Sequence, residues 1–124
     1  MTENRPLDFS LDRVIHERTR LAILTYLAGS PQRMVPFTEL KRNLNLSAGN
    51  LSVQLRNLEA ASYVRIVKSI VGRKPVTDIS ITLRGFEALA EYIAGMEEII
   101  GALKRVELNK PELSPDVDQT IKPD

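Results

Sequence analysis

The apolar residues of this chain change from a helical to an alternating spacing near residue 62 and return to a helical spacing near residue 82. Before the change, Leu51, Leu55 and Leu58 lie three and four positions apart, as on the buried face of a helix. After it, Ile79 and Ile81 alternate with polar neighbours, as on one face of a strand. This order predicts a mainly α fold that carries one small β-hairpin.

Two helices are predicted ahead of the change. The first covers residues 11–28, with Asp8 or Ser10 as its cap and a left-handed Gly29 at its end. Met34 and Val35 are expected to form a short edge strand. A second, short helix is predicted over residues 36–44, because its apolar positions again follow the three-and-four spacing.

A third helix is expected to follow at once. Residues 43–46 form a tight turn, and Ser47 is a good N-cap for a helix that runs to about Ala61. Strands at 64–69 and 76–81 then enclose a basic loop at 70–75. Thr82 is expected to cap a last helix over about residues 83–104.

The size and composition of the chain bound its organisation. With 124 residues, 43% of them hydrophobic, the chain suits one domain, which we place at residues 10–106 between an arm (1–9) and a disordered tail (107–124). Apolar residues four apart in the tail leave a docking peptide as the alternative. We expect a cytoplasmic protein without membrane contact, since no signal peptide and no long apolar run is present.

Enzymatic and metal chemistry find little support. The chain has no cysteine and one histidine, so thiolate sites are excluded and neither a metal nor another cofactor is expected. His16 lies beside no nucleophile and is expected to be structural. Glu97 and Glu98 are neighbours on a helix and do not face each other. The sequence therefore predicts that the protein is not an enzyme.

The net charge of +1 hides a strongly basic segment. Residues 41–84 hold eight lysine and arginine side chains against two acidic ones, and they include the end of the short helix at 36–44, the turn and the helix that follows it. Such a pair, with small polar residues on the second helix, is a helix-turn-helix motif. The coincidence of motif and charge favours binding of double-stranded DNA.

The candidate DNA contacts lie on this motif and on the hairpin. The helix at 47–61 is predicted to enter the major groove, where its small first turn lets the backbone approach the bases. The basic hairpin, 70–76, is predicted to contact the backbone or the minor groove. The candidates are Lys41, Arg42, Ser47, Ala48, Gly49, Asn50, Ser52, Val53, Gln54, Arg56, Asn57, Lys68, Arg73 and Lys74.

Several segments resemble small winged-helix regulators of the MarR/ArsR-like superfamily. They are residues 14–24, 37–41, 46–52, 55–59, 72–75 and 81–85, and the resemblance covers about residues 10–105. It implies a homodimeric transcriptional regulator, by analogy a repressor, with the third helix and the wing on DNA. The chain departs from that family at two places: Val53-Gln54 replaces a common Arg-His, and Ser62 replaces a glycine after the third helix.

The last helix, residues 83–106, is expected to pair with a second copy. Its apolar residues recur with the heptad spacing of a coiled coil over about three heptads. A dimer would place two third helices about one DNA turn apart and predicts a pseudo-palindromic operator. The candidate interface residues are Leu89, Ile93, Met96, Ile99, Ile100 and Leu103.

Two further readings stay open at this point. The first is suggested by the departure at positions 53–54. In it, the winged helix is a protein-interaction module that assembles through its last helix and does not read a specific DNA sequence. A small apolar effector in the dimer crevice is also open.

Overall fold

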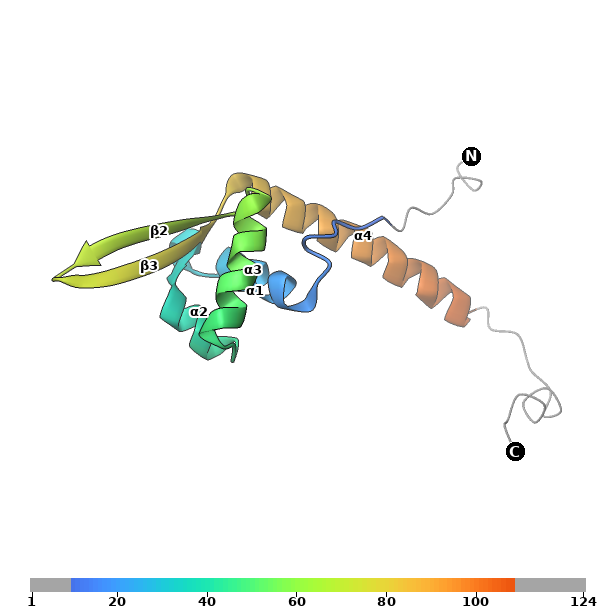
Figure 1. The fold of residues 1–124 in the computed structure, drawn as a ribbon. Helices are drawn as coiled ribbons and strands as arrows, with labels where there is room; N and C mark the ends of the chain where they lie inside the picture. The colour runs from blue at the N-terminus through green and yellow to red at the C-terminus, as the bar shows by residue number, and fades with distance from the viewer. Residues whose placement is uncertain (1–9, 109–124) are drawn as a thin grey trace, which may run out of the picture.

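The computed structural model describes residues 10–108, so the arm at 1–9 and most of the tail lie outside the described residues. A mainly helical body carries a three-stranded antiparallel sheet in the order β1-β3-β2 (Figure 1). This confirms the predicted fold class. The elements are α1 (Arg18–Ala28), a 3-10 turn (Pro31–Arg33), β1 (Met34–Pro36), α2 (Phe37–Asn43), α3 (Ala48–Ala60), β2 (Val64–Val71), β3 (Lys74–Ile81) and α4 (Leu83–Leu108).

One core joins the helices to the sheet. The predicted inward face of α3, Leu51, Leu55 and Leu58, is fully or almost fully buried. Around it lie buried residues from every other helix and strand and from the segment before α1: Ile15, Ile23, Leu24, Leu27, Val35, Leu40, Val64, Ile79, Ile81, Leu89 and Tyr92. The burial of aliphatic side chains from all these elements fixes α3 against the body of the domain.

The first helix starts later than predicted. It begins at Arg18, because the Asp12 carboxylate accepts hydrogen bonds from the backbone N–H groups of Val14 and Ile15 and holds them in a turn. Glu17, rather than Asp8 or Ser10, caps the helix by accepting the N–H of Arg20 at 2.9 Å. The short side chain of an aspartate often forms such local hydrogen bonds with the backbone, and these bonds compete with the hydrogen bonds of a helix.

The end of the first helix also differs from the prediction. Gly29 has a φ of −90°, so it is not left-handed. The left-handed positions come later, at Gln32 and Arg33, each with a φ of 56°. The Arg33 guanidinium there stacks 4.2 Å from the ring centre of Phe86 at the start of α4. The tight connection therefore brings β1 and the start of α4 together.

The predicted basic loop at 70–75 is wrong in extent. The strands continue to Val71 and Lys74, and only Gly72 and Arg73 form the turn. Both have positive φ, 56° and 71°, as in the type I′ turn that matches the twist of a hairpin. β1 pairs only with residues 78–80 of β3, so the far half of the hairpin extends away from the body (Figure 1).

Helices α2 and α3 end in the same way. In each, the residue after the C-cap has a positive φ: 55° at Asn45 and 65° at Ser62. The next N–H bonds five residues back, Leu46 to Lys41 O and Tyr63 to Leu58 O, as in a Schellman motif. The first motif makes the turn between α2 and α3, and the second directs the chain from α3 into β2.

The start of α4 closes on this second turn. Thr82 accepts the N–H of Gly85 at 2.9 Å, which confirms it as the cap, and donates its hydroxyl to Ser62 O at 2.7 Å. A Cβ on Gly85 would lie 2.2 Å from the Tyr63 carbonyl oxygen, so only glycine fits there. The hydrogen bond from the Tyr63 hydroxyl to Asp12, together with partial burial, raises the pKa of Tyr63 to about 12.

Helix α4 is continuous over 26 residues and ends at Leu108, just beyond the end predicted at residues 104–106. Gly95 does not interrupt it and instead gives room to the side chain of Leu11, which would lie 3.0 Å from a Cβ there. Among residues 10–108 there is no helix with the length and apolar content to cross a bilayer.

Replacing Ser62 with glycine is expected to stabilise the domain. A left-handed conformation raises the free energy of the folded state by about 1–2 kcal/mol for a residue with a Cβ, and glycine avoids this cost. Part of the benefit is lost, because glycine also gives the unfolded chain more conformational freedom. We expect Ser62→Gly to raise the free energy of unfolding by roughly 0.5–1 kcal/mol, measured by urea denaturation. Ser69→Gly, in an exposed stretch of β2, is the control and should lower it; a lower stability for Ser62→Gly itself would contradict the assignment.

Candidate nucleic-acid interface

The first turn of α3 carries small side chains and is exposed to solvent. Ser47, Ala48, Gly49 and Asn50 are all exposed, and Ser47 Oγ accepts the N–H of Asn50 at 3.0 Å, which confirms the predicted cap. A Cβ on Gly49 would meet no atom within 4 Å. Backbone N–H groups in a first helical turn have no partner within the helix. This end of α3 therefore allows another molecule to approach its main chain closely.

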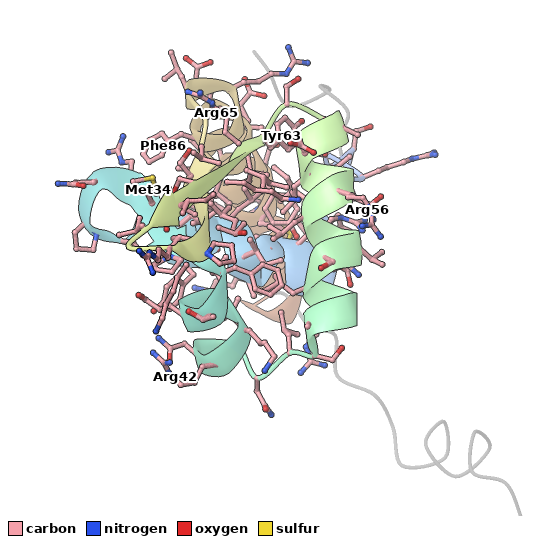
Figure 2. The ribbon with its side chains drawn as sticks, turned by 60° about the vertical axis from the view of Figure 1, so that its left-hand side comes forward. Met34, Arg42, Arg56, Tyr63, Arg65 and Phe86 are labelled. Carbon is pink, nitrogen blue, oxygen red and sulfur yellow. The ribbon has the colours of Figure 1, made fainter. Side chains whose placement is uncertain are left out.

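The rest of the outer face of α3 is short and nearly uncharged. Val53 is 46% exposed, Asn57 is exposed and Ser52 is half-buried. Arg56 is the cation of this helix, and it points away from the core (Figure 2). Amide, hydroxyl and methyl groups of this kind suit contacts with base edges and thymine methyls.

Gln54 occupies a different environment from the one its sequence position suggests. It is half-buried, and its Oε1 accepts a hydrogen bond from Arg20 Nη1 at 2.9 Å. Its Nε2 in turn donates to Asn50 Oδ1 at 3.2 Å. Arg20, which also donates to the Val14 carbonyl at 2.6 Å, was not among the candidate residues. The chain Arg20–Gln54–Asn50 orients the Asn50 amide from behind.

A groove of about 480 Å³ separates α3 from the hairpin. Arg56 lines it from α3 and Lys68 lines it from β2, so two cations reach it from opposite walls. Glu59, one turn beyond Arg56, adds a carboxylate at the far end of α3. Phe37, Ser52, Leu55, Ile66 and Thr77 complete the lining.

The remaining candidate cations lie on α2 and on the hairpin. Lys41 and Arg42 are exposed on the last turn of α2, and Arg42 projects outward in Figure 2. Arg73 and Lys74 are exposed at the end of the hairpin. Exposed cations thus lie on both elements that neighbour α3 in the chain, the helix before it and the hairpin after it.

The predicted dimer residues divide into two groups. Leu89 is 5% exposed and belongs to the core, so it has no surface left for a partner and leaves the candidate interface. Ile93, Ile100 and Leu103 are 43–62% exposed, and Met96 and Ile99 are half-buried. The C-terminal part of α4 runs beyond the body of the domain (Figure 1), whereas Met96 packs against the core.

His16 has a structural contact, in keeping with its predicted role. Its Nδ1 lies 2.8 Å from the hydroxyl of Tyr92, which ties the segment before α1 to α4. Residues 10–108 contain no group of three histidine, aspartate or glutamate side chains that would hold a metal ion.

A helix-turn-helix followed by a hairpin that flanks its second helix defines the winged-helix class. Residues 19–100 match the family model described as a winged helix DNA-binding domain, and the chain belongs to this family. Membership agrees with the expectation that the protein is not an enzyme.

Relatives share the fold over most of the chain. An uncharacterised protein of Methanocaldococcus jannaschii is 34% identical over 95 residues, which cover 77% of this chain and 98% of that protein. A transcriptional regulator homologue of Pyrococcus horikoshii OT3 is 30% identical with a TM-score of 0.69, over 74% of this chain and 89% of that one. A MarR family regulator of Streptomyces coelicolor, solved in complex with DNA, is 22% identical with a TM-score of 0.61, over 89% and 69%. The predicted winged-helix family is thereby confirmed, and MarR and ArsR family regulators share its fold.

Removing the Arg20 guanidinium is expected to weaken the domain. The Arg20 side chain is only 17% exposed, and Arg20→Ala leaves the Val14 carbonyl and the Gln54 amide without their partner. We expect the free energy of unfolding to fall by roughly 1–3 kcal/mol, measured by chemical denaturation. Arg18→Ala, exposed on the same helix, is the control and should change it by less than about 0.5 kcal/mol. Equal effects of the two variants would contradict this role of Arg20.

Proposed function

We propose that the protein is a homodimeric transcriptional regulator that binds double-stranded DNA, with α3 in the major groove and the hairpin as its wing. One observation carries this proposal. The first turn of α3 is exposed, small and polar, and the elements that precede and follow α3 in the chain carry exposed cations that suit the phosphates beside a major groove. The DNA in the structure of the Streptomyces relative supports the same use of the fold.

The contacts divide by chemistry. Asn50, Ser52 and Val53 face base edges, with Ala48 and Gly49 as the backbone that allows close approach. Asn57 and the Ser47 turn lie nearer the sugar-phosphate strand. The six cations bind phosphates: Lys41, Arg42, Arg56, Lys68, Arg73 and Lys74. Gln54 acts indirectly, because both of its bonds serve to hold Asn50 in place.

The dimer forms through the protruding part of α4. Ile93, Met96, Ile99, Ile100 and Leu103 present an apolar surface that a single copy leaves partly in water. A two-fold axis here places two α3 helices on one side of a duplex, roughly 34 Å apart, and gives a pseudo-palindromic operator. A dimer that covers an operator excludes other proteins from it, so we propose repression.

DNA binding is tested by fluorescence anisotropy with duplexes at several salt concentrations. We expect Arg73→Ala and Lys74→Ala each to weaken binding to every sequence and to reduce the salt slope by about one unit, as for a lost phosphate contact. Asn50→Ala is expected to relax discrimination at one base-pair position by roughly 1–3 kcal/mol while the salt slope stays unchanged.

The control is Glu98→Ala on α4, far from the DNA-binding face, which should leave affinity unchanged. Absence of binding to any duplex at low salt would exclude a DNA-binding function and favour an interaction module that assembles through α4. Identical behaviour of Asn50→Ala and the two wing variants would refute the division into base and phosphate contacts.

The dimer is tested by sedimentation equilibrium. Ile100→Asp places a charge at the centre of the proposed contact, and since Ile100 is 43% exposed the monomer should remain folded. We expect a wild-type dimer and an Ile100→Asp monomer with unchanged circular dichroism. Glu98→Ala, on the opposite side of the helix, should stay dimeric. A monomeric wild-type protein, or a dimeric Ile100→Asp variant, would show that α4 does not form this contact.

A further inference from the structure

The end of the hairpin is apolar as well as basic. Ile70 is 76% exposed and Val71 is 62% exposed, next to Lys68, Arg73 and Lys74. Both aliphatic residues stand on β2, the edge strand of the sheet, whose outer edge has no partner strand among residues 10–108. Such an exposed strand end is an aggregation hazard unless it has a use.

The two aliphatic residues lie on opposite faces of the hairpin. Side chains alternate along a strand, and Ile66 and Lys68 line the groove toward α3. Ile70 is two residues further on the same strand and therefore shares their face. Its cross-strand partner is Pro75, and the partner of Lys68 is Thr77, which also lines the groove. Val71 pairs with Lys74 on the opposite face.

The groove face thus runs from cationic to apolar toward the end of the wing. Arg56 and Lys68 lie on opposite walls of the groove, and the Ile70–Pro75 pair lies beyond them. A strand rises about 3.3 Å per residue, so Ile70 lies roughly 7 Å beyond Lys68, about two nucleotide steps along a DNA strand. A DNA strand whose phosphate meets Lys68 therefore presents a neighbouring deoxyribose to Ile70.

We propose that the Ile70–Pro75 pair packs against deoxyribose in the minor groove that flanks the α3 site, and thereby adds sequence preference to the wing. This rests on the proposed function. Proteins that bind the minor groove often bring apolar side chains into it, so an aliphatic contact there is favourable. The flanking cations, Lys68, Arg73 and Lys74, favour a polyanion over a second copy of the same basic hairpin.

The contact has two consequences that a phosphate contact lacks. An aliphatic side chain releases no counterion, so its part of the affinity is independent of salt. The guanine 2-amino group projects into the minor groove, where A·T pairs present only acceptors and no such group. The 2-amino group obstructs an apolar side chain that enters the minor groove. The wing should therefore prefer flanking base pairs that lack this group.

The experiment compares Ile70→Thr with Val71→Thr, which both keep β-branching and add a hydroxyl, on opposite faces of the hairpin. The duplex is the tightest one that the wild-type protein selects from random sequence, and anisotropy is measured at several salt concentrations. We expect Ile70→Thr to weaken binding about five- to tenfold with an unchanged salt slope, the scale of a partly buried aliphatic side chain. Val71→Thr should stay within about twofold.

A second comparison tests the groove. The flanking pairs of this duplex are set first to G·C and then to inosine·cytosine, which keeps the major-groove pattern of G·C and lacks the 2-amino group. Wild-type protein should bind the inosine duplex more tightly, and Ile70→Thr should lose that preference.

The possible failures are distinguishable. Wild-type binding with no loss in Ile70→Thr, an equal loss in Val71→Thr, or no inosine preference would each overturn the minor-groove contact and leave the proposed function intact. A wild-type protein that binds no duplex overturns both.

Discussion

The close approach of α4 to the end of α3 is the constraint on which the interface depends. Ser62 turns the chain through a left-handed conformation, and the absence of a side chain on Gly85 lets α4 lie directly on the Tyr63 carbonyl. The Thr82 hydroxyl bonds Ser62 O at the same point. Because β2 leaves this junction and β3 returns to it, the junction sets the angle between the hairpin and α3. The groove lined by Arg56 and Lys68 depends on that angle, because α3 and the hairpin form its walls.

Local patterns predicted much of this fold, and long-range contacts decided the rest. The spacing of Leu51, Leu55 and Leu58 and the capping residues Ser47 and Thr82 act within a few residues, so the sequence shows them directly. The environment of Gln54 depends on Arg20, 34 positions away and on another helix, and no spacing rule reveals such a partner. Leu89 likewise has a heptad position but lies in the core, since α1 and α4 pack together there.

The proposed division of labour follows from where charge is placed. α3 has one exposed cation and a short polar face, so its contribution to affinity is small and its contribution to selectivity depends on geometry. Asn50 contributes selectivity only if its amide has a fixed orientation, and the bonds from Gln54 and Arg20 supply that. The cations of α2 and the hairpin contribute affinity without regard to sequence. A stable scaffold is thus a condition for readout.

The apolar end of the wing gives this arrangement a further source of selectivity. Phosphate contacts alone bind all duplexes and weaken steeply with salt, so a protein that relies on them loses preference for its operator. An aliphatic contact with deoxyribose adds free energy that salt does not remove and that depends on the groove it enters. In the proposed dimer each copy contributes one such contact, at the outer flanks of the operator. Because the two contributions add in the free energy of one binding event, the five- to tenfold loss expected for Ile70→Thr, which changes both wings of the dimer, corresponds to roughly two- to threefold per wing.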